Sequence, residues 1–378
     1  MKIVIAIDSF KGCLSSAEAG QAVELGIRQA MPDAQVLCVP VSDGGEGMLE
    51  AFTAAMGGDI VTAPCHDPLM RPIEAQYGIS ADGACAIIEM AQASGLTRVA
   101  PDERDAWRAT TYGTGELIAH ALQRGCKHLL MGLGGSATTD GGRGMLEALG
   151  IRFDGDTVDL SQSLLTGLDL QVTVASDVQN PLCGTNGAAH VYGPQKGADP
   201  AMVERLDERL QQFADITAQT LGADYRNVPG AGAAGGMGFA LLAYLNAEML
   251  SGIDLLMDMV NFDDLVHGAD LVITGEGSAD HQTLMGKLPQ GILSRAQRHG
   301  VPTILVAGRI ADRQALLQAG FAQVECINPA DSLLSECLHP QVARHRLAAT
   351  AAQLMDSVIF GKVQIETQRF VLSAKPKT

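Results

Sequence analysis

The sequence lacks the residue patterns of several common site types. Its eight cysteines form no C-x-x-C pair, and its nine histidines form no H-E-x-x-H motif. In a chain of 378 residues such scattered cysteines are typical of reduced, mostly buried thiols, so we expect neither a disulfide framework nor a structural transition metal. The G-x-x-x-x-G-K-[ST] motif is absent, as are H-R-D and D-F-G, which excludes a P-loop enzyme and a protein kinase.

Positive charge and long apolar runs are scarce as well. The chain has 26 Lys and Arg against 43 Asp and Glu, a formal net charge of −17. This balance argues against nucleic acid and anionic membrane as partners, whereas a surplus of carboxylates suits Mg²⁺. Apolar runs such as Ile3–Ile7 have the length of strands and fall far short of the roughly 20 residues that span a bilayer. Because no signal-peptide pattern precedes this first run, we expect a cytoplasmic protein.

Short β-branched runs alternate with turns rich in Gly, Asp and Ser and with helical stretches. This alternation is typical of an α/β fold, in which helices cover both faces of a parallel sheet. The predicted strand and helix pairs are 3–7 with 16–30, 36–41 with 47–56, 128–133 with 142–149, 271–274 with 289–299, 303–306 with 311–319, and 324–327 with 342–360.

One stretch breaks the alternation and predicts a second domain. Residues 59–63, 73–79 and 84–89 read as three strands with only turns between them, which is typical of an antiparallel meander. The length of the chain also favours two domains. We therefore predict a discontinuous, doubly wound Rossmann- or flavodoxin-like domain of residues 1–60 and 262–378, and an inserted α/β domain with a mixed sheet of residues 61–261.

A glycine-rich turn occurs twice. The segments D-G-G-E-G-M-L-E-A-F at 43–52 and D-G-G-R-G-M-L-E-A-L at 140–149 match at eight of ten positions, and each follows a predicted strand and opens a helix. Adjacent glycines and free N–H groups at a helix N-terminus together favour anion binding. The simpler alternative is a helix cap with a tight turn. The preceding G-G-S-A-T at 134–138 adds hydroxyl and N–H donors suited to phosphate oxygens.

Other polar segments also follow predicted strands, where ligands bind in a doubly wound sheet. They are 8–12, 176–177 and 274–283, and the loop 193–197 adds Lys196. Each is alternatively an ordinary solvated loop. The G-x-G-x-x-G run at 230–235 has no convincing strand before it, so it is a weak dinucleotide fingerprint, although it could line a ligand cleft.

Taken together, these motifs resemble those of the type-1 glycerate kinase family from Lys2 to Phe360. The motifs that carry the resemblance are D-S-F-K-G at 8–12, S-D-G-G-E-G at 42–47, T-Y-G-T-G-E at 111–116, G-G-S-A-T at 134–138, D-G-G at 140–142, G-P-Q-K-G at 193–197, T-G-E-G at 274–277 and D-H-Q-T at 280–283. The resemblance implies two α/β domains with the active site in the cleft between them, and ATP and Mg²⁺ as co-substrates. It implies phosphoryl transfer to D-glycerate in sugar-acid or glyoxylate catabolism, at O2 rather than the alternative O3.

Hypothetical roles follow from this resemblance. We expect Asp280 to orient or deprotonate the acceptor hydroxyl, and Lys11 and Lys196 to neutralise phosphate or carboxylate. The expected nucleotide-binding residues are Gly134, Gly135, Ser136, Thr138, Gly141, Gly275 and Gly277. The expected substrate-binding residues are Ser9, Asp43, Gly44, Gly45, Arg71, Gln282, Thr283 and Lys287. The expected Mg²⁺ ligands are Asp8, Asp177 and Glu276, with Asp43 as a further candidate.

The two copies of the turn lie in different predicted domains, which suggests a division of labour. The turn at 134–142 would bind nucleotide phosphates, and the turn at 43–47 would bind glycerate or the metal. Two rival functions are a dehydrogenase of small hydroxy acids, which would need NAD(H), and a hydroxy-acid sensor, which would need neither ATP nor Mg²⁺. A monomer and a homodimer both remain open.

Overall fold

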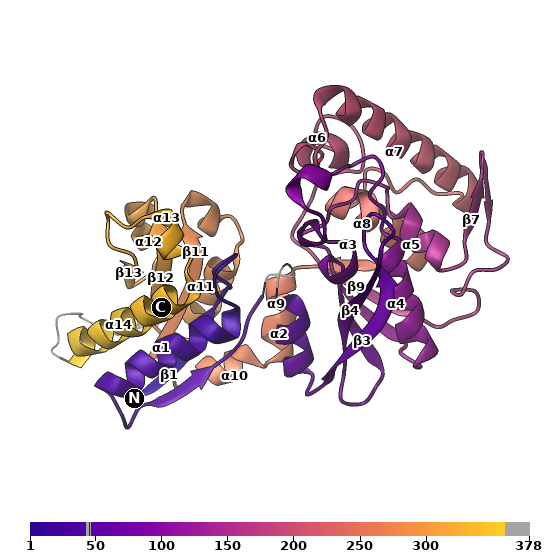
Figure 1. Cartoon of the computed structure of the whole chain (residues 1–378). Helices are drawn as coiled ribbons and strands as arrows, with labels where there is room; N and C mark the ends of the chain where they lie inside the picture. The colour runs from indigo at the N-terminus through magenta and orange to yellow at the C-terminus, as the bar shows by residue number, and fades with distance from the viewer. Residues whose placement is uncertain (43–44, 46, 360–378) are drawn as a thin grey trace, which may run out of the picture. The chain divides into compact units, whose positions relative to one another are not determined.

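The computed structural model describes residues 1–42, 45 and 47–359 and shows an α/β protein (Figure 1). Its contacts divide the chain into two compact units. Unit 1 comprises Met1–Val41 and the residues from Met257 onwards, and unit 2 comprises Ser42–Leu256. Unit 1 is therefore discontinuous in sequence, and unit 2 is inserted into it.

Unit 1 is built on a fully parallel sheet in the order β13-β12-β11-β1-β2. Its strands are β1 (Lys2–Ile7), β2 (Gln35–Cys38), β11 (Leu271–Ala279), β12 (Thr303–Ile310) and β13 (Gln323–Cys326). Its helices are α1 (Ser16–Ala30), α10 (Phe262–Val266), η4 (His281–Leu284), α11 (Leu288–Arg298), α12 (Arg313–Gln318), α13 (Leu334–Cys337) and α14 (Pro340–Ile359).

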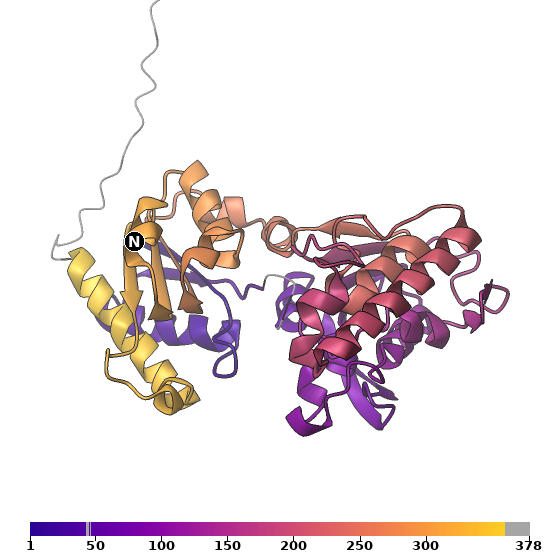
Figure 2. The ribbon, with the colours of Figure 1, turned by 90° about the horizontal axis from the view of Figure 1, so that it is seen from above.

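Both faces of this sheet are covered. Ile304 and Val306 of β12 join the core under α1 and α14, whereas Leu305 and Ala307 join the core that contains residues of α11 and α12. This alternation follows from the two-residue period of a strand. Figures 1 and 2 show α14 lying along α1, and the contact is close because Gly26 has no side chain: a Cβ there would lie 2.0 Å from a carbonyl oxygen of α14.

Unit 2 is built on a mixed sheet in the order β10-β9-β6-β5-β4-β3, in which β5, β6, β9 and β10 are parallel and β3–β5 form an antiparallel meander. Its strands are β3 (Asp59–His66), β4 (Pro72–Ile79), β5 (Cys85–Glu89), β6 (His128–Gly132), β9 (Gln171–Ala175) and β10 (Glu248–Leu250), with a separate hairpin of β7 (Arg152–Asp154) and β8 (Thr157–Asp159).

The helices of unit 2 enclose a continuous apolar core around this sheet. They are α2 (Met48–Ala55), α3 (Ala91–Ser94), η1 (Leu96–Arg98), η2 (Pro101–Glu103), α4 (Tyr112–Gln123), α5 (Arg143–Ala148), α6 (Ala188–Tyr192), η3 (Pro194–Lys196), α7 (Pro200–Leu221) and α8 (Ala233–Leu245). The last helix, α9 (Gly252–Met259), spans the second boundary between the units.

The fold class predicted from the sequence is confirmed in its two sheets, one parallel and one mixed. The unit boundaries differ from the predicted 60/61 and 261/262, because they fall at 41/42 and 256/257. Helix α2 accounts for the first difference, since Phe52 is fully buried and α2 packs on β3, β4 and β5 of unit 2. Within the described residues, no helix is both long and apolar enough to cross a membrane.

Candidate functional site

In unit 1 the predicted site residues gather where β1 and β11 run side by side. Ile7 pairs with Gly275, and the next amide, that of Asp8, donates to the carbonyl of Gly275 at 2.9 Å. The carboxyl ends of parallel strands lie at the same edge of a sheet, so Asp8 and Glu276, the next residues after this pair, come side by side at this edge. The structure thus brings together two carboxylates that lie 268 residues apart in sequence.

The segment 274–279 is strand rather than the glycine-rich loop that the sequence predicts. It continues β11 to Ala279, paired with β12 from Gly275↔Val306 to Ala279↔Ile310. Glycine is required at 275, because a Cβ would lie 2.2 Å from the carbonyl oxygen of Val306. The glycines therefore serve strand packing at this point, and the polar turn begins only at Asp280.

Asp280 caps the short helix η4, and two further hydrogen bonds, both made by Thr283, connect it to Glu276 of the sheet. Its Oδ1 accepts from the amide of Gln282 at 2.8 Å, and its own amide donates to Thr283 Oγ1 at 2.9 Å. The Thr283 hydroxyl in turn donates to Glu276 Oε1 at 2.6 Å. The Nζ of Lys287 lies 3.8 Å from Glu276 Oε2.

Glu276 is a buried carboxylate, with 7% of its surface exposed. Burial raises the pKa of Glu276, while the Thr283 hydrogen bond and the charges of Lys287 and Lys11 act to lower it. Both carboxylate oxygens thus already have a partner in unit 1, so one predicted metal ligand is committed to the protein itself.

The loop after β1 carries two more predicted residues. Phe10 and Leu14 bridge the ends of this loop, Gly12 takes a φ of 71°, and Lys11 is exposed between them. Ser9 is buried with 7% exposure, and its Oγ has no hydrogen-bond partner among the described residues. A buried hydroxyl without a partner costs free energy, so Ser9 retains a hydrogen bond to offer a ligand.

In unit 2 the G-G-S-A-T segment forms a turn that is held against α3. The amide of Ala137 donates to the carbonyl of Ser94 at 3.0 Å, and the carbonyl of Gly135 accepts from Leu96 at 2.8 Å. Gly135 has a φ of 72°. Thr138 is fully buried, and its Oγ1 lacks a partner within the part of the chain that the structure describes.

Lys196 lies directly beneath this turn. Its Nζ donates to Ser136 Oγ at 2.9 Å and to the carbonyl of Thr138 at 2.6 Å, and only 2% of the residue is exposed. Burial lowers the pKa of Lys196 from 10.5 to about 7, although nearby Asp140 acts in the opposite direction. The sequence placed this lysine in a loop, whereas the structure makes it a buried cation that supports the turn.

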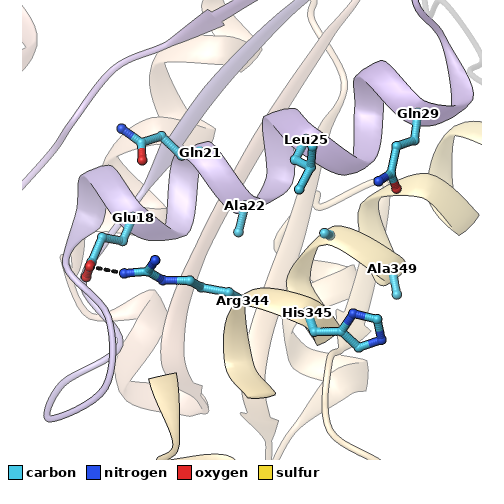
Figure 3. A pocket seen from close by; sticks show the side chains of 9 residues that line it. Glu18, Gln21, Ala22, Leu25, Gln29, Arg344, His345 and Ala349 are labelled. Atoms are coloured by element: carbon cyan, nitrogen blue, oxygen red, sulfur yellow. Dashed lines mark hydrogen bonds and ion pairs between the residues drawn. The ribbon is translucent and has the colours of Figure 1, made fainter. Parts of the chain in front are cut away.

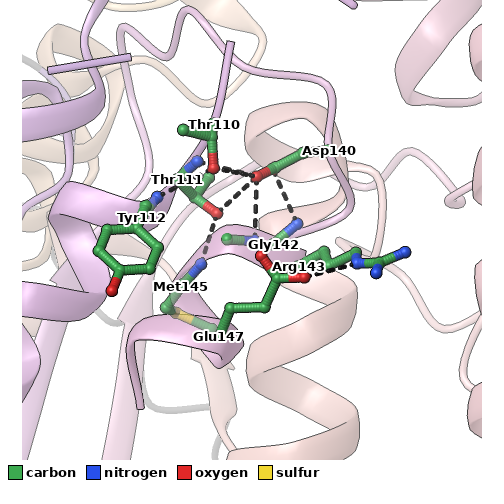
Figure 4. A network of polar contacts seen from close by, with 9 residues as sticks. Thr110, Thr111, Tyr112, Asp140, Gly142, Arg143, Met145 and Glu147 are labelled. Atoms are coloured by element: carbon green, nitrogen blue, oxygen red, sulfur yellow. Dashed lines mark hydrogen bonds and ion pairs between the residues drawn. The ribbon is translucent and has the colours of Figure 1, made fainter. Parts of the chain in front are cut away.

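Asp140 is the centre of a hydrogen-bond network (Figure 4). Its Oδ2 accepts from the amide of Thr111 at 2.8 Å, from the Thr111 hydroxyl at 2.9 Å and from the amide of Gly144 at 3.2 Å. Its Oδ1 accepts from the amide of Gly142 at 3.1 Å. The amides of Gly142 and Gly144 at the start of α5, which the sequence predicts to bind an external anion, therefore donate to the carboxylate of the D-G-G turn itself.

The glycines of this turn are packed against protein. A Cβ on Gly141 would lie 2.8 Å from the ring of Phe213, and a Cβ on Gly142 would lie 2.5 Å from Ala240 Cβ. Gly141 remains a predicted phosphate contact, but the structure also gives a packing reason for glycine here, because a side chain would clash with Phe213. The simpler alternative, a helix cap with a tight turn, describes this copy well.

The first copy of the turn lies in unit 2 as well, so the two copies do not fall in different units as the sequence suggests. The predicted residues Asp43 and Gly44 lie outside the described residues. A Cβ on Gly134 would lie 2.6 Å from the Cα of Gly45, so the two glycine-rich segments touch through their backbones. The amide of Leu49 at the start of α2 donates to Glu89 Oε2 at 3.2 Å.

Two other predicted residues, Arg71 and Asp177, lie on other segments of unit 2. Arg71 donates through Nε to Asp67 at 2.5 Å, through Nη1 to Glu103 at 3.1 Å, and through Nη2 to a backbone carbonyl. Its guanidinium is thus largely engaged by carboxylates of the chain itself. Asp177 is exposed and follows β9. Within residues 1–42, 45 and 47–359, no group of three or more His, Cys, Asp or Glu side chains is arranged to hold a metal ion.

Sequence reasoning missed residues that pack behind the turn at 134–142. Ala234, Gly235 and Gly236 all have positive φ at a kink in α8, and the carbonyl of Gly235 accepts from the amide of Gly141 at 3.0 Å. Arg209 donates to the carbonyl of Thr139 at 2.7 Å. The glycine run at 230–236 was the available signal, and the structure shows close packing there, since a Cβ on Gly235 would lie 1.9 Å from the carbonyl oxygen of Thr138.

The hollows of the surface do not by themselves mark the site. One of about 350 Å³ lies between α1 and α14, beside the Glu18–Arg344 ion pair (Figure 3), and no predicted site residue lines it. Another, of about 710 Å³, lies between α5 and α7, and among the charged groups of its lining are Asp140, Arg143 and Arg209.

Comparison with known proteins identifies the family. A model of the glycerate kinase family matches residues 3–359. The chain belongs to the glycerate kinase family. It is 46% identical over 328 residues to the glycerate 2-kinase of Escherichia coli, covering 82% of this chain and 86% of that protein. It is 42% identical to a glycerate kinase of Bacillus subtilis, covering 96% and 99%.

A solved structure supports the same assignment. The crystal structure of a putative glycerate kinase 2 from Salmonella typhimurium is similar with a TM-score of 0.82 and 42% identity, over 96% of this chain and 99% of that one. Membership of the glycerate kinase family confirms the resemblance that the motifs predict.

Proposed function

We propose that this chain is an ATP-dependent glycerate kinase that transfers the γ-phosphoryl group of ATP to O2 of D-glycerate, giving 2-phosphoglycerate and ADP. The observation that carries this proposal is the family match over residues 3–359, together with 46% identity to a protein named glycerate 2-kinase. The alternative acceptor, O3, is an outcome that the product's ³¹P spectrum distinguishes.

The turn at 134–139 is the proposed holder of the nucleotide phosphates. Phosphoryl transfer needs positioning and charge neutralisation more than covalent chemistry. The turn provides a buried ammonium, that of Lys196, directly beneath backbone that contains Gly134 and Gly135. The hydroxyl of Thr138, which has no partner within the described part of the chain, adds hydrogen-bonding capacity at the same place.

The polar edge of unit 1 is the proposed holder of the acceptor. Asp280 is half-buried at the start of η4, where a carboxylate can accept the proton of a substrate hydroxyl. The exposed ammonium of Lys11 and the half-exposed Lys287 supply positive charge for a carboxylate or phosphate. Ser9, in the loop after β1, has a buried hydroxyl without a partner among the described residues.

Magnesium would neutralise charge on the transferring phosphoryl group. Mg²⁺ in kinases is held by one or two carboxylates together with phosphate oxygens and water, so a dedicated cluster of three protein ligands is not required. Asp8, at the end of β1, and Asp177, after β9, fit that limited role. Glu276 fits it less well, because Thr283 and Lys287 already engage its two oxygens.

The test is a coupled assay of ADP release with ATP, Mg²⁺ and D-glycerate. We expect D280N to lower kcat by about 10²- to 10⁴-fold, with the KM for ATP nearly unchanged, because only a proton acceptor is removed. The matched control is D312N, since Asp312 also caps a helix of unit 1, α12, and asparagine is an equally good cap.

The results for the wild-type protein test the proposed function, and those for D280N test the role of Asp280. If the wild-type protein releases no ADP in response to glycerate, the proposed function is wrong. If the wild-type protein is active and D280N retains its turnover, only the role of Asp280 is wrong.

A further inference from the structure

The hydrogen bonds of Thr283 run in one direction, from the acidic cap to the sheet. The amide of Asp280 donates to Thr283 Oγ1 at 2.9 Å, so that oxygen is an acceptor. The hydroxyl proton is then free to be donated, and it goes to Glu276 Oε1 at 2.6 Å. Thr283 is fully buried, so water does not compete for either bond.

The far end of this chain of bonds is rigid. Glu276 lies in β11, whose backbone is paired with β12 at Glu276↔Ala307. Lys287, which precedes α11, lies 3.8 Å from the second oxygen of the same carboxylate. By contrast, η4 has only four residues, and so short a helix is not stable without outside contacts.

We infer that Thr283 and Glu276 are positioning residues, which fix the backbone and carboxylate of Asp280 against the central sheet, rather than ligands of substrate or metal. This inference rests on the proposed function, in which Asp280 acts on the acceptor hydroxyl. It assigns to the buried pair a role different from the substrate contact and metal ligand that the motifs suggest.

The main test is T283V, which keeps the shape of the side chain and removes both hydrogen bonds. We expect kcat to fall by about tenfold or more, while the KM values for ATP and glycerate change little, because orientation rather than binding is lost. T283S, which keeps the hydroxyl, should retain most of the activity. The control is T303V, because Thr303 is a buried threonine of the same unit whose Oγ1 has no partner in the described part of the chain.

A double-mutant cycle shows whether Thr283 acts through Asp280. In the D280N background, T283V should cost little further activity, since the group that it orients has been removed. Independent, multiplying effects of the two substitutions would overturn the inference. So would a T283V enzyme with normal kcat and a raised KM for glycerate, which would make Thr283 a substrate contact.

The metal alternative is tested through E276Q. If Glu276 binds Mg²⁺, E276Q should raise the Mg²⁺ concentration needed for half-maximal activity, and T283V should not. That result would overturn the inference. We expect instead that E276Q leaves the Mg²⁺ requirement nearly unchanged, and that it lowers kcat less than T283V does, because the amide oxygen of glutamine can still accept the hydrogen bond of Thr283.

Hydrogen exchange provides a measurement that needs no activity. The amide of Asp280 should be protected in the wild-type protein and in T283S, and it should exchange faster in T283V. An unchanged exchange rate in T283V would refute the positioning bond, whether or not the protein phosphorylates glycerate. A wild-type protein without kinase activity would refute the proposed function separately.

Discussion

Lys196 allows the environment of the turn at 134–139 to be probed through the dependence of protein stability on pH. Its buried ammonium donates to Ser136 Oγ and to the carbonyl of Thr138, and burial lowers its pKa from 10.5 to about 7. Below about pH 7 the folded protein carries this desolvated charge, which costs about 5 kcal/mol relative to the unfolded chain. As the pH rises from about 7 to about 10.5, the folded protein loses the proton first, so its stability increases.

The perturbation is K196M, which keeps an unbranched side chain one atom shorter than lysine and removes the titrating group. The two lost hydrogen bonds, to Ser136 and Thr138, contribute a difference that does not depend on pH. Other titrating groups cancel when the two proteins are compared. We therefore expect the free energy of unfolding of the wild-type protein, relative to K196M, to rise by about 2 kcal/mol between about pH 7 and pH 9, and to be flat below about pH 6.

The assay is urea unfolding followed by the fluorescence of Trp107. It is the only tryptophan of the chain and stacks on Arg205 and Arg209 within unit 2, so it reports on the unit that contains Lys196. The exposed Lys127 of the same unit provides the control K127M, which should show no such trend. A K196M difference that stays constant across the whole range would refute the reasoning, because it would mean that Lys196 titrates alike in the folded and unfolded chains.

Two further predictions concern the packing behind the same turn. G235A should destabilise unit 2 by at least about 2 kcal/mol, because φ at this residue is 68° and the new Cβ would lie 1.9 Å from the carbonyl oxygen of Thr138; an unchanged urea midpoint would contradict this. D140N should cost about 3 kcal/mol, because an amide nitrogen would face donors that the carboxylate now accepts, including the amides of Thr111 and Gly142. Equal stability of D140N and the wild-type protein would show that the network in Figure 4 contributes little.

The sequence predicted the elements whose signals are local. Helix α1 was expected at 16–30 and lies there, because Ser15 and Glu18 form a capping box at its start. The meander of β3, β4 and β5 was expected from strands separated only by turns. In both cases the residues that decide the structure lie within a few positions of it.

The sequence was less informative where distant segments decide the structure. The glycines at 275 and 277 resemble a loop, but β1 and β12 on either side hold that segment as strand. The local sequence does not reveal how fully Asp140 is engaged, because three of its donor groups belong to Thr110 and Thr111, about 30 residues earlier. The burial of Lys196 depends on contacts with Ser136, which is 60 residues away.

The interior position of β1, between β2 and β11, has a consequence for synthesis of the chain on the ribosome. Ile3 pairs with Leu271, so β1 waits for one of its two partner strands, which is made 268 residues later, on the order of tens of seconds at usual elongation rates. Gly26 of α1 waits still longer, for Ala348. The inserted unit is complete in the nascent chain before this happens. The residues of β1 and α1 therefore reach their native places long after they are synthesised, and their buried isoleucines need protection from aggregation until then.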